Sequence, residues 1–373
     1  MILDAHLDAK PDANFGANSG ANSDANPDAE ARASIALAAQ TIRLGGLIGL
    51  PTETVYGLGA DADNAAAVAK IFSAKGRPSN HPLIVHVADA TAVEHFAQGV
   101  PAFAQRLIQA FWPGPLTLIL PRRPRVAAAA AGGQASIGLR CPAHPVAQAL
   151  LKILRQEGGD GAPAVHGIAA PSANQFGRVS PTTARHVQAE FGNDLLILDG
   201  GACDVGIESA IIDCTRGVPV LLRPGTLTLA QLSAACGQQV LLNDALLAED
   251  SDAPRASGTL ESHYAPRAKV RLMDARALQA ALDLLGADLD AKRDGTLDAT
   301  AHIATWSRLI LKSRSARILR RRMPDDAVAT AQQLFSVLRD FDAQGVKLIW
   351  IETPPVTPEW DGVRDRLQRA AAG

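Results

Sequence analysis

Short apolar runs alternate with stretches of helical spacing through most of the first two thirds of this chain. The runs end at glycine, proline or polar residues, which is typical of strands in a buried or half-buried sheet. We predict strands at Leu47–Leu50, Leu83–Val87, Leu116–Leu120, Ser136–Arg140, Ile168–Ala170, Leu195–Leu198, Ala210–Asp213 and Val220–Arg223. This pattern favours an α/β domain built on a large twisted sheet.

Helices are predicted between several of these strands. An alanine-rich stretch at 31–43 is closed by a pair of glycines. Asn64 can cap a helix whose apolar residues recur at i, i+3 and i+4, and Gly76 can end it. Further helices are expected near 101–111, 145–156 and 182–191.

A second, smaller α/β pattern occupies the C-terminal third. Strands at Val270–Met273, Ile303–Trp306 and Val346–Ile351 enclose helices at Arg276–Leu285 and around Leu334–Phe341. We predict a Rossmann-like unit at 269–373, joined to the first domain by a polar linker at 236–268. The unit lacks G-x-G-x-x-G, so its fold type alone indicates no dinucleotide.

The N-terminal residues differ in composition from both units. Residues 4–30 repeat small residues in an Asp-Ala-Asn theme and offer almost nothing to bury. We therefore predict a disordered tail at 1–30, followed by the first domain at 31–235.

Bulk composition excludes several classes of protein. The 373 residues carry 36 basic against 38 acidic side chains, whereas a protein that grips a nucleic-acid backbone is usually markedly basic. The four cysteines form no C-x-x-C pair, which argues against a zinc site and a disulfide framework. No apolar run is long enough to span a membrane, and Asp4 and Asp8 interrupt any signal peptide. We therefore expect a cytoplasmic protein without a membrane partner.

One candidate for phosphate binding is Lys75-Gly76-Arg77-Pro78. Pro78 biases Arg77 toward an extended conformation, and Lys75 and Arg77 then project to the same side. Two cations beside a glycine suit a polyphosphate, Arg as a planar fork and Lys as a point charge. A solvated Lys-x-Arg is the commoner occurrence of this pattern.

Two further segments follow predicted strands, where ligands collect in open α/β sheets. Ser172 and Asn174 stand two apart in Ala170–Asn174 and could face one ligand, although such residues are also common in plain turns. Pro51–Gly59 carries glycines that permit close backbone approach. A Walker-type phosphate loop does not occur in the sequence, so any nucleotide needs another cradle.

Taken in order, these segments resemble the YrdC-like threonylcarbamoyl-AMP synthases over about residues 32–236. The matching motifs are Thr52–Gly59, Lys75–Pro78 with His81–Val87, Trp112–Thr117, Ser136–Arg140, Pro171–Asn174, Ser180–Thr182, Gly206–Ser209 and Leu222–Gly225. Ser262-His263-Tyr264-Ala265-Pro266 and the second α/β unit resemble the long form of the family. The resemblance implies a large mixed-sheet catalytic domain followed by a smaller Rossmann-like domain.

The family reaction, as the resemblance implies it, joins L-threonine, bicarbonate and ATP into threonylcarbamoyl-AMP and releases pyrophosphate. The product would pass to a tRNA threonylcarbamoyltransferase complex. Matching positions for ATP and its phosphates are Lys75, Arg77, Ser136, Ser172, Asn174, Ser180 and Arg223, of which Lys75 and Arg77 would be catalytic. Matching positions for L-threonine are Thr52, His86, Arg140 and Ser209, with Arg140 facing the carboxylate. Mg²⁺ is expected on the phosphates rather than in a protein cage.

The linker motif adds Tyr264, which we expect to reach the bound nucleotide as the linker folds over the active site. Two departures from the family pattern stand nearby. Ala210 replaces the threonine of Glu-Ser-Thr, and His81 interrupts the usual Asn-Pro-Leu. His86 could instead be a core histidine, and the sequence identifies no general base.

Two other functions remain open at this point. YrdC-like domains also occur in hydrogenase-maturation carbamoyltransferases, but those carry cysteine-rich zinc motifs ahead of the domain, which this chain lacks. An RNA-binding module would use the basic run Lys312, Arg314, Arg317, Arg320, Arg321 and Arg322. If that run is helical, it is most often a solvated face, so direct tRNA binding is expected to be weak or absent.

Overall fold

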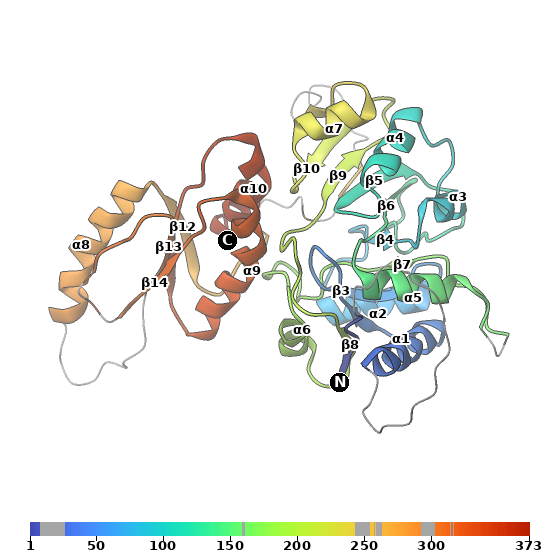
Figure 1. Cartoon of the computed structure of the whole chain (residues 1–373), viewed down its shortest axis with the longest axis horizontal. Coiled ribbons are helices and arrows are strands. Elements are labelled where there is room, and N and C mark those ends of the chain that lie inside the picture. Colours follow the sequence, from blue (N-terminus) through green and yellow to red (C-terminus); the bar gives the residue numbers. More distant parts are fainter. Residues whose placement is uncertain are drawn as a thin grey trace, which may run out of the picture.

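The computed structural model describes residues 1–7, 27–158, 161–242, 254–256, 258, 263–291, 303–313, 315 and 317–373. Its elements form two α/β domains that lie side by side (Figure 1). The first domain contains strands β1 (Ile2–Asp4), β2 (Ile48–Leu50), β3 (Gly57–Asp61), β4 (Ile84–His86), β5 (Leu116–Pro121), β6 (Ser136–Arg140), β7 (Ile168–Ala169), β8 (Leu196–Asp199), β9 (Ala210–Asp213), β10 (Val220–Arg223) and β11 (Leu241–Leu242). Its helices are α1 (Pro27–Arg43), α2 (Ala65–Lys75), α3 (Val93–Phe96), α4 (Ala102–Phe111), α5 (Pro145–Arg155), α6 (Ala184–Phe191) and α7 (Leu229–Cys236), with a 3₁₀ turn at Ala90–Ala92.

The strands of the first domain form one mixed sheet in the order β1-β8-β2-β3-β7-β4-β6-β5-β9-β10-β11. β4 and β6 pair in parallel, while β7 runs antiparallel to both of its neighbours, β3 and β4. One apolar cluster packs α2, α4 and α7 against the sheet, and a second packs α1 and α5. The segments that follow β2, β4, β6 and β7 therefore come from the middle of a sheet with helices on its surfaces.

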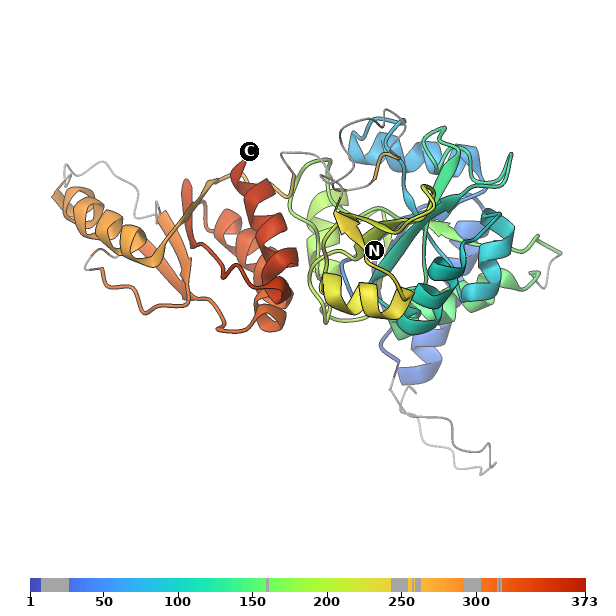
Figure 2. The same ribbon diagram turned by 90° about the horizontal axis from the view of Figure 1, so that it is seen from above.

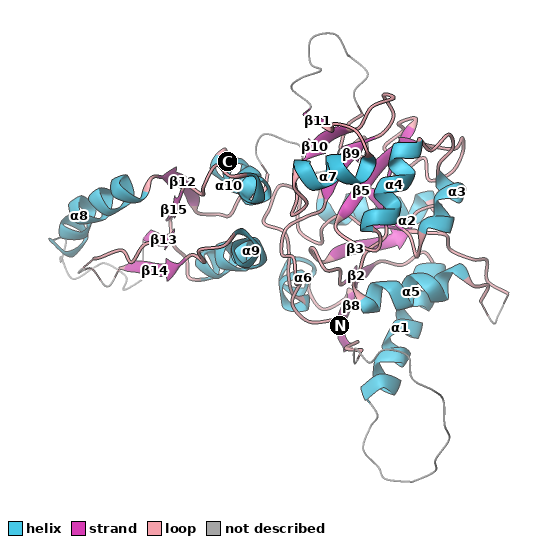
Figure 3. Cartoon of the chain, turned by 45° about the horizontal axis from the view of Figure 1, so that its top comes forward, coloured by secondary structure: helices cyan, strands magenta, loops and turns pink. Residues whose placement is uncertain are grey.

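The second domain has a four-stranded parallel sheet in the order β12-β15-β13-β14. Its strands are β12 (Lys269–Met273), β13 (Ile303–Ser307), β14 (Ile318–Arg322) and β15 (Leu348–Glu352), and its helices are α8 (Ala275–Ala291), α9 (Ala327–Ala343) and α10 (Asp361–Ala371), with a 3₁₀ turn at Pro358–Trp360. Helices α9 and α10 face the first domain, and α8 lies on the far side of the sheet (Figures 1 and 3).

The two domains share an apolar core. Val55, Val179 and Ile207 of the first domain belong to the same buried cluster as Phe335 of α9 and Val363 of α10. Figure 2 shows the two helices against the first domain from a second direction. Burying these side chains together stabilises the contact by the hydrophobic effect, so the second domain is packed onto the first rather than loosely tethered.

Local signals account for the elements that match the expectations. Asn64 accepts a hydrogen bond from Ala67 N at 3.0 Å and starts α2, and Gly76 ends it in the left-handed conformation with φ of 62°. Thr183 likewise caps α6 through His186 N, so the helix begins two residues later than the predicted 182. The predicted strands all occur, with ends displaced by at most two residues.

Within the described residues, seven helices and strands were not predicted: β1, β3, β11, β14, α3, α7 and α10. β3 is glycine-rich, and β14 consists largely of arginine, so neither has an apolar strand pattern. α10 is charged on most of its surface. β1 is three residues long and pairs in parallel with β8 at the sheet edge, which contradicts a disordered tail over all of 1–30. Residues 8–26 of that tail lie outside the described residues.

The last three residues of the basic run lie in a strand rather than a helix, and Lys312 and Arg317 precede that strand. Arg320, Arg321 and Arg322 belong to β14, and Arg314 lies outside the described residues. Arg321 pairs with Asp340 at 2.6 Å and Arg322 pairs with Asp325 at 2.8 Å. These carboxylates offset part of the positive charge that the run would present to RNA.

Candidate active site

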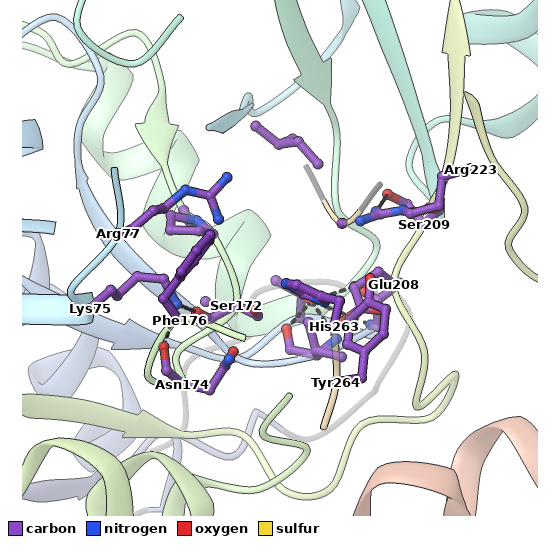
Figure 4. A pocket seen from close by; sticks show the side chains of 18 of the residues that line it. Lys75, Arg77, Ser172, Asn174, Phe176, Glu208, Ser209, Arg223, His263 and Tyr264 are labelled. Atoms are coloured by element: carbon purple, nitrogen blue, oxygen red, sulfur yellow. Dashed lines mark hydrogen bonds between the residues drawn. The ribbon is translucent and has the colours of Figure 1, made fainter. Parts of the chain in front are cut away.

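A pocket opens between the first domain and the linker. Figure 4 shows Lys75 and Arg77 on one side and Ser209 and Arg223 on the other. The lining residues are Thr52, Thr54, Val55, Gly57, Lys75, Arg77, Ile84, His86, Arg140, Ala170, Pro171, Ser172, Asn174, Phe176, Gly177, Glu208, Ser209, Arg223, Gly258, His263 and Tyr264.

Lys75, the last residue of α2, is buried and points into the segment after β7. Its Nζ donates to the carbonyl oxygen of Ser172 at 2.6 Å and also to that of Asn174. Burial, with a further contribution from Arg77, lowers the pKa of Lys75 well below its usual range. Both acceptors are neutral, so an anionic ligand would favour the charged ammonium strongly at this position.

Arg77 lines the same pocket as Lys75, although the segment between them is not extended, because Lys75 ends α2 and Gly76 is left-handed with φ of 62°. Its Nη2 donates to Pro82 O at 3.0 Å, and its guanidinium lies 5.6 Å from the ring centroid of Phe176. Burial lowers the pKa of Arg77 to about 10, so the side chain keeps its charge at neutral pH. A planar, charged fork on the pocket wall is suited to phosphate oxygens.

Ser172 and Asn174 both line the pocket from the loop after β7. The backbone of Ser172 forms an antiparallel bridge with Gly57, so the motif sits against the start of β3. A side chain at Gly57 would bring its Cβ within 3.0 Å of Ala170, which explains the glycine at this close approach. Asn174 Nδ2 donates to Arg178 O at 2.9 Å, whereas its Oδ1 has no hydrogen-bond partner among the described residues.

The opposite end of the pocket is built around Arg140 at the end of β6. Its Nη2 lies 2.5 Å from Glu53 Oε1, its Nη1 donates to Thr54 Oγ1 at 2.7 Å, and its Nε donates to Gly114 O at 3.2 Å. Thr52 Oγ1 in turn lies 2.9 Å from Thr54 Oγ1. The guanidinium is therefore held rigidly while one face of it still borders the pocket.

His86, on β4, is buried beside Arg140 and lines the same end of the pocket. Burial, and then the charge of Arg140, lower the pKa of His86 to about 3. The imidazole is consequently neutral at physiological pH, so it acts as a hydrogen-bonding group rather than as a cation.

Glu208 and Ser209 follow Gly206 in the loop before β9. Ser209 Oγ lies 2.8 Å from Thr117 Oγ1, and Arg223 Nη2 donates to Ser209 O at 2.9 Å. Ser180 is fully buried and donates to Glu208 Oε1 at 2.5 Å, so it lies behind Glu208 and is not among the lining residues. Its predicted contact with ATP stays a prediction.

Ser136, also predicted to contact ATP, lies in a neighbouring hollow. That hollow shares Ile84 with the pocket and is lined by Pro82, Leu83, Ile84, Thr117, Ile119, Ser136, Gly138, Ile211, Arg255 and Ala256. Arg255 N donates to Gln134 Oε1 at 2.8 Å, which ties the linker to the strand that carries Ser136. Apart from Ser180, the predicted site residues thus fall into one pocket and one adjoining hollow.

The linker reaches the pocket through His263 and Tyr264. Their rings meet edge to face with centroids 4.0 Å apart, and Tyr264 packs 5.3 Å from Phe335 of α9. Tyr264 has a φ of 60°, a conformation that bulky residues rarely adopt. Its hydroxyl has no hydrogen-bond partner among the described residues. The tyrosine therefore joins the second domain to the pocket.

The comparisons with known proteins cover both domains. Residues 40–225 match the family described as "Telomere recombination", and residues 227–372 match "Threonylcarbamoyl-AMP synthase, C-terminal domain". The threonylcarbamoyl-AMP synthase of Bacillus subtilis is 37% identical over 91% of this chain and 93% of its own length. The chain belongs to the threonylcarbamoyl-AMP synthase family.

Other members of the family agree over the same span. The threonylcarbamoyl-AMP synthase of Pyrococcus abyssi is 36% identical over 90% of this chain and 94% of its own length. The structure of P. abyssi Sua5 complexed with L-threonine superposes with a TM-score of 0.77 at 34% identity, covering 90% of this chain and 94% of the other. The fold is therefore that of a two-domain threonylcarbamoyl-AMP synthase, as the sequence predicted.

Several pocket residues of this synthase were not predicted as site residues. Thr54 and Glu208 lie inside the quoted motifs, and His263 stands directly before Tyr264. In the sequence, these residues stand next to predicted site residues. Such adjacency does not reveal which side chains face the pocket. Among the residues that the structure describes, no group of three His, Cys, Asp or Glu side chains could hold a metal ion. No helix within the described ranges is long and apolar enough to cross a lipid bilayer.

Proposed function

We propose that this chain synthesises L-threonylcarbamoyl-AMP and pyrophosphate from L-threonine, bicarbonate and ATP, for modification of tRNA in the cytoplasm. The observation that carries the proposal is one pocket with two cationic ends. Lys75 and Arg77 suit the polyphosphate of ATP, and Arg140 suits the carboxylate of an amino acid. Membership of the family and the threonine complex of P. abyssi Sua5 support the same assignment.

The reaction consists of two bond-forming steps. The amine of threonine adds to the carbon of carbon dioxide derived from bicarbonate, and the amine loses a proton. A carbamate oxygen then attacks the α-phosphorus of ATP, and the bond to pyrophosphate breaks. Both steps gain from positioning and from compensation of negative charge, which are the contributions that this pocket can make.

We assign ATP and its phosphates to Lys75, Arg77, Ser172, Asn174 and Arg223, with Arg223 across the pocket from Lys75 and Arg77. Lys75 and Arg77 act on the charge that develops as pyrophosphate leaves, and in this sense they are catalytic. Ser136, in the adjoining hollow, is assigned to the nucleoside. Tyr264 covers the nucleotide and excludes water from a product that hydrolyses easily.

We assign the amino-acid end to Thr52, His86, Arg140 and Ser209. Arg140 receives the carboxylate, and Glu53 and Thr54 keep its guanidinium in place. The neutral imidazole of His86 leaves no competing positive charge beside the amine. Ala210 lies on β9 and is not among the lining residues, whereas Ser209 is.

Mg²⁺ would accompany the phosphates of ATP. The two carboxylates on or beside the pocket, Glu53 and Glu208, are each paired with an arginine, so the donor set does not resemble a protein cage for the ion. The product would pass to a tRNA threonylcarbamoyltransferase complex, with weak or no direct tRNA binding by this chain.

The deciding experiment measures pyrophosphate release by the purified chain with threonine, bicarbonate or ATP omitted in turn. Release that needs all three, and that is lost in Lys75→Ala, supports the proposal. Release without threonine, or consumption of carbamoyl phosphate instead, would point to the carbamoyltransferase reaction.

A further inference from the structure

One side chain of the second domain reaches the back of the pocket wall. Arg366, on α10, is fully buried. Its Nε donates to Glu208 Oε2 at 2.8 Å, and its Nη2 donates to the main-chain oxygen of Glu208 at 3.0 Å. A residue from outside the catalytic domain thus holds both the carboxylate and the carbonyl group of a pocket residue.

The remaining nitrogen of Arg366 is bonded as well. Nη1 donates to Pro224 O at 2.8 Å and lies 2.7 Å from Asp365 Oδ2. Pro224 follows Arg223, which lines the pocket. One guanidinium therefore joins the two catalytic-domain loops that carry Glu208 and Arg223.

These contacts bear directly on Ser209. The carbonyl oxygen of Glu208, which Arg366 holds, belongs to the peptide group that precedes Ser209. The carbonyl oxygen of Ser209, which Arg223 holds at 2.9 Å, belongs to the next peptide group. Two arginines from different domains therefore hold the two peptide groups that flank Ser209, and restrict the directions in which its hydroxyl can point.

The backbones around this contact leave little room for adjustment. A Cβ on Gly206 would lie 2.4 Å from Gln332 Cα of α9, and a Cβ on Gly362 of α10 would lie 2.5 Å from Gly225 O. Glycine at both positions lets the helices of the second domain rest on the two loops. The Arg366 guanidinium also lies 5.4 Å from the centroid of the Tyr264 ring, so the ring packs against the guanidinium on that side.

The positive charge of Arg366 forms a buried ion pair with the carboxylate of Glu208. Burial by itself would raise the pKa of Glu208, but Arg366 and then Arg223 outweigh it and bring the pKa below its usual value. Ser180 and Arg366 each bond one of the carboxylate oxygens. Removal of Arg366 would leave a buried carboxylate with a weaker set of partners and a loop free to turn.

We propose that Arg366 is a positioning residue for the synthase reaction, which orients Glu208 and the following Ser209 for threonine. The inference rests on the proposed function and deepens it. It assigns the second domain a part in building the amino-acid end of the pocket, in addition to covering the site.

The test compares threonine-dependent pyrophosphate release in four proteins: the unmodified chain, Arg366→Met, Glu208→Gln and the double variant. We expect kcat/KM for threonine in Arg366→Met to fall about 10- to 100-fold, the usual effect of losing a residue that orients a ligand group. Arg366→Lys should recover only part of this, because an ammonium cannot replace three separately directed N–H groups. Arg364→Met is the matched control, because Arg364 lies on the same helix and bonds Pro355 O and Thr357 O within the second domain.

The double variant separates positioning from general stability. Arg366 acts on Glu208 partly through the carboxylate, so Arg366→Met should cost less in the Glu208→Gln background than in the unmodified chain, although the bond to the main-chain oxygen remains there. Losses that multiply, or an equal loss in Arg364→Met, would overturn the inference. If Arg366→Met does not fold, Arg366→Lys completes the same cycle. An unmodified chain that releases no pyrophosphate would instead count against the proposed function.

Discussion

Lys75 Nζ donates a hydrogen bond to the carbonyl oxygen of Ser172 at 2.6 Å, across 97 positions of sequence. The bond joins two motifs that looked independent along the chain. It places an ammonium group under the loop that also presents Ser172 and Asn174 to the pocket. Lys75 and the loop that carries Ser172 and Asn174 thus form a single structural unit, so a change in one should also affect the other.

Lys75→Met should reduce kcat/KM for ATP about 100-fold or more, because removal of one preorganised donor typically costs that much. Pyrophosphate release measures the effect. Lys70→Met is the matched control, since Lys70 lies on the same helix and donates to Gly45 O at 2.6 Å, away from the pocket. Equal losses in the two variants would contradict a phosphate role for Lys75.

ATP binding should take up a proton at alkaline pH. The pKa of Lys75 is lowered by burial, whereas the phosphates of ATP favour its charged form and raise that pKa again. Between the lowered pKa and the ordinary value of 10.5, binding therefore protonates the amine. Calorimetry at pH 9 in two buffers of different ionisation enthalpy measures the uptake. The pKa of Arg77 is about 10, so this residue is already largely charged at that pH. Proton uptake that persists in Lys75→Met would mean that a group other than Lys75 takes up the proton.

Arg140→Lys should raise KM for threonine roughly tenfold or more and leave ATP affinity nearly unchanged. A lysine cannot contact Glu53, Thr54 and Gly114 as the guanidinium does, nor form a bidentate pair with a carboxylate. Steady-state kinetics with each substrate varied separates the two effects. Arg155→Lys, at a partly exposed pair with Asp89, is the control. A larger change in KM for ATP than for threonine would reverse the assignment of the two ends.

Tyr264→Phe should release the product sooner and increase its hydrolysis. The phenol oxygen borders the pocket and has no hydrogen-bond partner among the described residues, so its loss removes a ligand contact without breaking one within the protein. A single-turnover experiment with trapping of released threonylcarbamoyl-AMP measures both rates. The chain has one other tyrosine, Tyr56, whose hydroxyl donates to Gly201 O at 2.7 Å. Tyr56→Phe should cost about 1 kcal/mol of stability without changing product release. Unchanged kinetics in Tyr264→Phe would leave the residue a structural role only.

The folded state should lose stability as the pH falls from 7 to 5. His86 and His263 have pKa values of about 3, lowered chiefly by burial, against 6.5 when unfolded. Because the unfolded chain then binds more protons, stability decreases as the pH drops through 6.5, by about 2 kcal/mol for each histidine at pH 5. Urea denaturation at the two pH values measures the difference. His86→Asn should reduce the slope and the exposed His6→Asn should not, so equal slopes would refute the account.

The sequence predicted those elements whose signals are local. α2 has its cap at Asn64 and its stop at Gly76, so twelve or so residues contain all the information needed. β3 differs, because Gly57–Asp61 becomes a strand only through its antiparallel neighbours β2 and β7. β14 likewise depends on β13, since its own arginines carry no strand pattern. Pairing with a distant strand overrides weak local propensity in both cases.

The site shows the same division between local and distant information. Motif spacing predicted that Lys75 and Arg77 act together on an extended segment. Lys75 instead ends α2 and Gly76 is left-handed, so the two side chains reach the same pocket through a different local geometry. Motif spacing could not reveal that Ser180 lies behind Glu208, or that Arg140 is paired with Glu53, because these relationships depend on where separate loops meet. Arg366 had no motif at all, and the packing of α10 against the first domain gives it Glu208 and Pro224 as partners.

The contact between Arg366 and Glu208 spans 158 residues, so the ribosome makes the carboxylate well before its partner. At translation rates of roughly 5–20 residues per second, the interval is on the order of ten seconds. During that time Val55, Val179 and Ile207 lack the apolar side chains of α9 and α10 that later cover them. The nascent catalytic domain therefore exposes an apolar surface during this interval. Assisted folding would be of most benefit at this stage, before the enzyme has to be active.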